Sequence, residues 1–159
     1  MAVVLAAGPD SILLIRRAER EDDRWSGQLA FPGGRRSPTD ADLASTARRE
    51  TLEEVGVDLA AAPLLGVLDD LAPRTPVAPP LIVRPHVYLL AGRPEFVLNH
   101  EVSAAWWLPL TAFELPGAYG PTEHLRYGTL VRTPGYHLEA GVVWGMTERI
   151  LTSLLELLP

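Results

Sequence analysis

The sequence predicts a single α/β domain over residues 1–159, and three observations lead to this fold class. Short runs rich in aliphatic and β-branched residues recur along the chain, separated by glycine, proline and polar turn residues. Two longer segments, about residues 40–55 and 142–158, have the composition or the apolar spacing of helices. The length of 159 residues suits one domain with an adequate hydrophobic core.

The composition argues against several classes of protein. A net charge of −6 does not favour non-specific binding to nucleic acid or to acidic membranes, which requires a basic face. The absence of cysteine excludes disulfides and thiolate metal sites. No apolar run approaches the roughly 18–20 residues of a membrane span, and the start of the chain does not resemble a signal peptide. We therefore expect a cytoplasmic protein that binds neither nucleic acid nor membrane.

The chain is expected to start with a β-hairpin. Residues 2–7 and 11–17 are β-rich runs, and Gly8-Pro9-Asp10 between them is a turn signal. The highly charged residues 16–26 then predict a loop that returns to a short strand at 28–31.

Residues 31–57 predict a glycine turn followed by a helix. Thr39 is the predicted N-cap, and Asp40 and Asp42 are expected in the first helical turn, where acidic groups suit the helix dipole. Gly56 is expected to end the helix in a left-handed conformation.

Three glutamates gather on one side of this helix. At about 100° per residue, Glu50, Glu53 and Glu54 project into an arc roughly 100° wide. Like charges at these spacings destabilise a helix by a few tenths of a kcal/mol per pair, and Arg49 offsets part of this cost by pairing with Glu53. The pattern fits either a solvated acidic face or a site for a hard divalent cation, which prefers oxygen ligands.

Several elements are predicted after the helix. Strands are expected at residues 62–71, 81–90, 95–98 and 102–108. The proline-rich loop 72–80 is expected to be semi-rigid, either beside the active site or as a plain connection. A short helix at 110–115 precedes strands at 124–132 and 135–139 around an expected turn at Thr133-Pro134-Gly135. Residues 142–158 predict a closing helix with a core-packing face.

Residues 34–57 resemble the signature of the Nudix hydrolases, G-x5-E-x7-R-E-U-x-E-E-x-G-U, in which U is a bulky aliphatic residue. Gly34 matches the opening glycine. The second half of the signature matches in order and spacing at Arg49-Glu50, Glu53-Glu54 and Gly56-Val57.

The match to this signature has three departures. The spacing from Gly34 to Arg49 is one residue longer, Asp40 lies near the place of the first glutamate, and Thr51 occupies an aliphatic position. The extra residue falls in the loop before the helix, where insertions cost little.

The resemblance implies a fold, a cofactor and a reaction. The expected fold is the Nudix α/β/α sandwich, a mixed β-sheet between the Nudix-box helix and a C-terminal helix. The implied cofactor is Mg²⁺ or Mn²⁺, held by Glu50, Glu53 and Glu54. Glu53 and Glu54 are also candidates for the catalytic base, and Arg49 would orient a glutamate by ion pairing. Gly33-Gly34 would let the backbone turn tightly beside the metal and the substrate.

Glu101 is a further candidate outside the signature. In many Nudix proteins an acidic residue on a loop facing the metals acts as a base or an extra ligand, and Glu101 precedes an apolar run in a similar context. A structural role for Glu101 is the alternative.

A second resemblance points to the coenzyme A diphosphatase branch of the Nudix enzymes, whose upstream motif is LLTxR[SA]x3Rx3Gx3FPGG. Arg17, Ala18, Gly27 and the FPGG string match. Ile15 replaces the threonine, Asp22 occupies the place of the inner arginine, and the loop is one residue longer. The string VVWGMTERIL near the C-terminus also resembles this branch.

Arg17 is the residue on which this second resemblance bears most directly. An arginine here would contact a phosphate of the substrate, since its guanidinium matches phosphate geometry. A solvated charge at the end of a strand is the alternative.

The resemblance implies hydrolysis of a diphosphate bond in a nucleoside-diphosphate-linked small molecule. The first expectation is coenzyme A or a derivative, giving phosphopantetheine and adenosine bisphosphate. The alternatives are another nucleotide, such as a (d)NTP, a dinucleotide, ADP-ribose or a nucleotide sugar, and a Nudix-like domain that binds a nucleotide without cleaving it. The intact set Arg49, Glu50, Glu53 and Glu54 favours an enzyme. Homodimers occur among Nudix enzymes, so a homodimer is one possible assembly.

Overall fold

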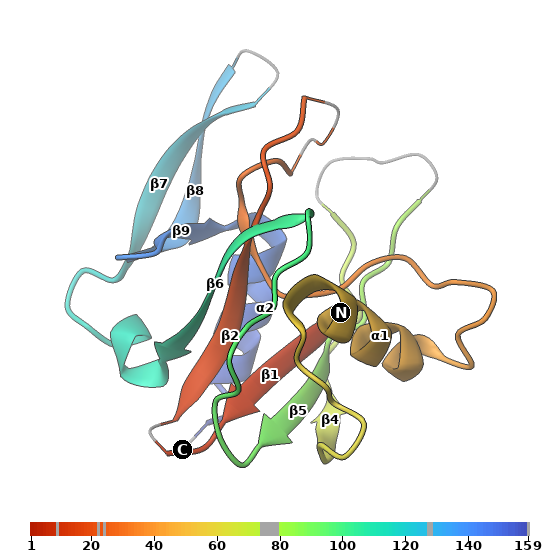
Figure 1. The fold of residues 1–159 in the computed structure, drawn as a ribbon. Helices are drawn as coiled ribbons and strands as arrows, with labels where there is room; N and C mark the ends of the chain where they lie inside the picture. The colour runs from red at the N-terminus through yellow and green to blue at the C-terminus, as the bar shows by residue number, and fades with distance from the viewer. Residues whose placement is uncertain (9, 22, 24, 74–79, 127–128, 159) are drawn as a thin grey trace.

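The computed structural model describes residues 1–158 except 9, 22, 24, 74–79 and 127–128 (Figure 1). The larger β-sheet contains β1 (Ala2–Ala6), β2 (Ser11–Arg17), β3 (Leu29–Ala30), β4 (Leu64–Val67), β5 (His86–Leu90) and β6 (Val102–Pro109). The smaller sheet contains β7 (Tyr119–Arg126), β8 (Thr129–Leu138) and β9 (Gly141–Trp144). The helices are α1 (Leu43–Val55), the short 3-10 helix η1 (Leu110–Phe113) and α2 (Gly145–Leu155).

The larger sheet is mixed, as expected. Strands β1 and β5 pair in parallel, whereas the other pairs are antiparallel. Strand β2 pairs with β6 along its length, and its other edge pairs first with β1 and then with β3. The end of β2, where the charged loop begins, therefore lies between β3 and β6.

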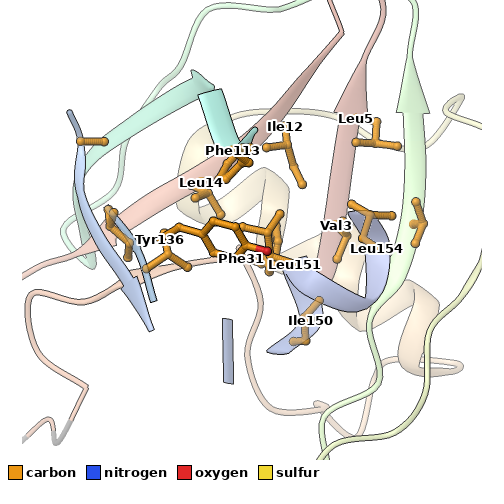
Figure 2. Close-up of a cluster of buried hydrophobic side chains, with 14 residues drawn as sticks. Val3, Leu5, Ile12, Leu14, Phe31, Phe113, Tyr136, Ile150, Leu151 and Leu154 are labelled. Atoms are coloured by element: carbon orange, nitrogen blue, oxygen red, sulfur yellow. The ribbon is translucent and has the colours of Figure 1, made fainter. Parts of the chain in front are cut away.

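Both faces of the larger sheet are covered by a helix. In β1, Val3 and Leu5 belong to the cluster that packs with Ile150 and Leu154 of α2, as Figure 2 shows. The alternate residues of β1 pack with residues of α1, and every residue of β1 is buried. Because neighbouring strand residues point to opposite faces, this pattern confirms the sandwich of a mixed sheet between two helices.

The structure differs from the predicted elements at three places. Residues 133–135 do not form a turn but lie inside the long strand β8, and the chain turns instead between β8 and β9. Residues 95–98 are not a strand, because their backbone binds the end of α1. The closing helix begins at Gly145 rather than at 142, because the preceding residues pair with β8 as strand β9.

The proline-rich loop falls largely outside the described residues. Residues 74–79 of the predicted loop 72–80 are among those that the structure does not describe. At its base, an isolated bridge joins Leu71 to Val83, and Arg84 forms an ion pair with Asp70 at 2.7 Å. Asp22, which occupies the inner arginine position of the upstream motif, is also outside the described part. Among the described helices, none has the length and apolar character needed to cross a membrane.

Candidate active site

Helix α1 begins three residues later than the sequence prediction for its cap. Asp42, not Thr39, is the N-cap: its backbone is extended and its carboxylate accepts a hydrogen bond from the backbone N–H of Ser45 at 2.7 Å. No acidic residue lies in the first turn, so the prediction for Asp40 and Asp42 is wrong. The predicted end is confirmed, because Gly56 has φ 72° and its N–H donates to the carbonyl of Leu52.

Arg49 is the centre of an ionic network on this helix. Its Nε and Nη2 atoms donate to the two carboxylate oxygens of Asp40, each at 2.9 Å. Its Nη1 atom lies 2.8 Å from Glu50 Oε1 and 2.9 Å from Glu53 Oε2. The expected pair between Arg49 and Glu53 is therefore present, and Arg49 positions two of the candidate metal ligands at once.

Asp40 anchors this network from outside the helix. Its carboxylate accepts hydrogen bonds from Arg49, from the backbone N–H of Ser37 at 2.8 Å and from the hydroxyl of Thr46 at 2.9 Å. The bond from Arg49, followed by that from Ser37, holds the pKa of Asp40 well below its usual range, and the same pair raises the pKa of Arg49. Asp40 is thus a positioning residue, a role that its place in the sequence did not reveal.

Glu54 is the buried carboxyl of the site. Only 2% of its surface is exposed, and its Oε2 atom accepts a hydrogen bond from the backbone N–H of Gly33 at 2.9 Å. Burial raises the pKa of Glu54 to about 7, the bond from Gly33 opposes this, and repulsion from Glu50 adds to it. Arg17 and Glu101 act on the same carboxyl with smaller effects of opposite sign. The ionisation of Glu54 therefore depends on the charges of Glu50, Arg17 and Glu101.

The two glycines before the helix are needed for close approach. Gly33 has φ 150°, and a Cβ atom there would lie 2.6 Å from the Cα atom of Met1. A Cβ atom on Gly34 would lie 2.4 to 2.5 Å from the carboxylate atoms of Glu50. The absence of a side chain at Gly34 therefore allows the backbone to pass directly against Glu50, a candidate metal ligand.

The segment before β6 brings Glu101 to the helix. The N–H of Val97 donates to the carbonyl of Val55 at 2.9 Å, and the N–H of Asn99 donates to the carbonyl of Glu54 at 3.1 Å. The side chain of Asn99 then accepts from the N–H of Glu101 at 2.8 Å. The last carbonyls of a helix lack partners within the helix, so this segment satisfies two of them and fixes the backbone of Glu101 beside the end of α1.

These side chains line one cleft of about 310 Å³, called here the carboxylate cleft. Its walls are Gly34, Arg35, Glu50, Glu53, Glu54, Asn99 and Glu101. The predicted glutamates of the helix and Glu101 therefore meet in one place. Arg35 and Asn99 were not predicted, since neither belongs to a residue pattern that sequence reasoning could single out.

The cleft suits a divalent cation by its donor chemistry. As they stand, no three His, Asp or Glu side chains among the described residues converge closely enough to hold a metal ion. Arg49 binds both Glu50 and Glu53 in this arrangement. The cleft nevertheless offers several carboxylate oxygens together, which is what Mg²⁺ and Mn²⁺ prefer.

Arg17 is the last residue of β2. Its Nε and Nη2 atoms donate to the same oxygen of Asp23, at 2.9 and 2.7 Å. The N–H of Ala18 donates to the carbonyl of Glu101 at 2.8 Å, which places the end of β2 beside the carboxylate cleft. Arg17 is thus close to the cleft and oriented by an acidic residue that the sequence analysis did not single out.

Comparison with known proteins identifies the family. The family profile described as NUDIX domain matches residues 1–127. The chain belongs to the Nudix family. This Nudix chain is 34% identical over 149 residues to the uncharacterized Nudix hydrolase NudL of Salmonella newport (strain SL254), covering 92% of the chain and 74% of NudL. It carries a Nudix pyrophosphohydrolase domain for nucleoside-diphosphate-linked substrates, and Nudix hydrolases generally use divalent metal ions.

A second relative and a solved structure show how much of a longer protein the chain matches and which fold it shares. The Nudix chain is 44% identical over 110 residues to uncharacterized protein C14C4.10c of Schizosaccharomyces pombe, covering 66% of the chain and 33% of that protein. The chain thus spans about a third of the length of this relative. The crystal structure of the Nudix hydrolase RenU from M. smegmatis has a TM-score of 0.61 at 16% identity, covering 99% of this chain and 84% of RenU. At this identity the likeness concerns the fold.

Proposed function

We propose that this Nudix domain hydrolyses the diphosphate bond of coenzyme A or a derivative, giving phosphopantetheine and adenosine bisphosphate, with Mg²⁺ or Mn²⁺ as cofactor. The observation that carries the reaction is the meeting of Glu50, Glu53, Glu54 and Glu101 in one cleft. The choice of coenzyme A is supported by the upstream motif and by Arg17 at the rim of this site.

Glu50, Glu53 and Glu54 are the proposed metal ligands. A divalent cation bound there would neutralise charge on the diphosphate and lower the pKa of a water molecule. The exposed side chain of Glu53 and the buried one of Glu54 approach the cleft from successive positions of the helix. Arg49 and Asp40 act through these ligands by fixing Glu50 and Glu53.

The proton of the attacking water goes to a carboxylate of the same cleft. Glu53, Glu54 and Glu101 are the candidates for this base, because all three line the cleft. Arg17 is the proposed contact to a substrate phosphate, and Gly33-Gly34 forms the turn against which the diphosphate lies. The guanidinium of Arg17 keeps donors beyond those bound to Asp23, since arginine has five N–H groups.

The test is a substrate panel with purified protein and Mg²⁺ or Mn²⁺, read by product identity. The panel contains coenzyme A, acetyl-coenzyme A, NADH, ADP-ribose, diadenosine polyphosphates and (d)NTPs. We expect coenzyme A to be cleaved well above the rest, and Glu53→Gln to lower turnover by about 10²-fold or more. The exposed Glu95→Gln is the matched control and should keep normal turnover. Normal turnover by Glu53→Gln would contradict the metal assignment.

A second candidate function is hydrolysis of another nucleotide by the same site. The observation that favours it is the pairing of Arg17 with Asp23 in a loop that departs from the coenzyme A motif. Preference for a panel member without the pantetheine arm would select this alternative. A cytoplasmic location and a possible homodimer remain predictions of the sequence.

A further inference from the structure

A larger cavity of about 1000 Å³ adjoins the carboxylate cleft and is called here the long groove. Gly34 and Arg35 line both cavities, so the two cavities adjoin at these residues. The residues that line the long groove also come from β3, from strands β8 and β9, and from the start of α2. Its volume is that of a site for a drug-sized ligand, and nothing in the proposed chemistry at the glutamates uses it.

The junction of the two cavities carries positive charge. Arg35 lines both cavities, and Arg17, which is paired with Asp23, lines the groove. Among the described residues, the guanidinium of Arg35 has no ion-pair or hydrogen-bond partner. The chain has a net charge of −6, yet the guanidinium of Arg35 offers cationic donors at the place where a diphosphate would pass from the cleft into the groove. The substrate is thus expected to bend around the glycine turn, with one end in each direction.

Farther along the groove, Thr133 presents a polar atom without a partner. Its hydroxyl oxygen is buried and makes no hydrogen bond with the described part of the chain. Buried polar atoms in native proteins are nearly always paired, so an unpaired hydroxyl on a cavity wall points to a ligand or a water molecule. A hydroxyl can donate to a carbonyl oxygen of such a ligand.

Glu148 supplies a second polar group on the same groove. It is only 5% exposed, and its Oε1 atom accepts from the hydroxyl of Tyr119 at 2.9 Å and from that of Thr152 at 3.2 Å. Among the described residues the other oxygen, Oε2, has no hydrogen-bond partner, so it can accept from a ligand N–H. Trp144 and Met146 add apolar surface to this part of the groove, which His124 and Arg149 also line.

We propose that the long groove binds the arm of the substrate beyond the diphosphate, and that this arm carries amide groups. Thr133 donates to an amide carbonyl, Glu148 accepts from an amide N–H, and the apolar surface of the groove covers the methylene carbons between them. This inference rests on the proposed function, because the arm of coenzyme A has this chemistry. It assigns substrate recognition to β8 and α2, which contribute no carboxylate to the cleft.

The test uses the two products of coenzyme A cleavage as separate ligands, since they divide the substrate at the diphosphate. Binding of phosphopantetheine and of adenosine 3′,5′-bisphosphate is measured by calorimetry with Mg²⁺ present. Thr133→Val and Glu148→Gln are each expected to weaken phosphopantetheine about three- to tenfold, the effect of one hydrogen bond. Binding of adenosine 3′,5′-bisphosphate should not change.

Thr129→Val is the matched control, because Thr129 lies in the same strand but is exposed and outside the groove. It should leave the binding of both products unchanged. Thermal unfolding of each variant verifies the fold. Thr133→Val exchanges groups of nearly equal shape and keeps the test informative if Glu148→Gln proves unstable.

Each outcome decides the inference. Weakening of adenosine 3′,5′-bisphosphate instead of phosphopantetheine would assign the groove to the nucleoside half and overturn the proposal, as would no change for either product. Cleavage of coenzyme A by wild type together with normal phosphopantetheine binding by both variants would refute the groove and leave the proposed function standing. Failure of wild type to cleave coenzyme A, with selective weakening of phosphopantetheine in the variants, would refute the function and support the groove. Failure of wild type both to cleave coenzyme A and to bind phosphopantetheine would refute both.

Discussion

The buried carboxyl of Glu54 should make the metal-free protein less stable as the pH rises. Burial raises its pKa from 4.5 to about 7 in the folded chain. Between these values the folded state binds more protons than the unfolded state, so the free energy of unfolding falls with increasing pH. At about 1.4 kcal/mol per pH unit, this interval corresponds to about 3 kcal/mol. The contribution is fully present below pH 4.5 and is lost as the pH passes through 7.

The assay is urea unfolding of wild type and of Glu54→Gln in EDTA, at about pH 4.5 and at about pH 8. The glutamine keeps the shape and an acceptor for the N–H of Gly33 but cannot ionise. We expect wild type to lose up to about 3 kcal/mol more than the variant between the two pH values. Other groups titrate in both proteins and cancel in the difference. Added Mg²⁺ should raise the stability of wild type at pH 8 more than that of the variant.

The difference in stability between wild type and Glu54→Gln, compared at the two pH values, tests whether ionising the buried Glu54 is costly. If wild type and Glu54→Gln lose stability in parallel, burial of an ionised Glu54 is not costly and the electrostatic account of the cleft is wrong. The exposed Glu95→Gln serves as the control, and its stability should follow wild type at both pH values.

Three other substitutions test the supports of the cleft. Gly34→Ala should lower turnover about tenfold or more with little change in melting temperature, because the new Cβ displaces the flexible carboxylate of Glu50. Gly92→Ala, at a position with nothing within 4 Å, should leave turnover normal. Arg49→Lys should lower kcat about 10- to 100-fold in a steady-state assay, since lysine cannot bind two oxygens of one carboxylate while holding two glutamates. Gly56→Ala should lower the free energy of unfolding by about 1 kcal/mol or more in urea titrations, because its φ is 72°. Unchanged stability there would contradict the need for glycine.

The parts of the site that the sequence predicted depend on short-range spacing. Glu50, Glu53 and Glu54 follow helical periodicity, so their common direction is fixed once the helix is predicted. The role of Asp40 depends on the path of the loop before the helix, which brings it to an arginine nine positions away. Sequence spacing does not encode such a path. Glu101 was identified only by resemblance, and its placement depends on backbone bonds to the end of α1.

The misread segment at Thr133-Pro134-Gly135 has a physical explanation. Proline and glycine usually mark turns, but here Pro134 lies opposite Pro121 within the ladder between β7 and β8. A Cβ atom on Gly135 would lie 2.9 Å from the carbonyl oxygen of Val143. The glycine therefore serves the close approach of two strands, which composition alone cannot distinguish from a turn.

The two cavities are built by different parts of the chain. The carboxylate cleft belongs to α1 and the segment before β6, whereas the far wall of the long groove belongs to the smaller sheet and α2. Substitutions in the smaller sheet can therefore change which compound is held without moving the glutamates. Divergence within the family would then be expected to alter substrate choice at β8 and α2 first, while the bond-breaking residues stay as they are.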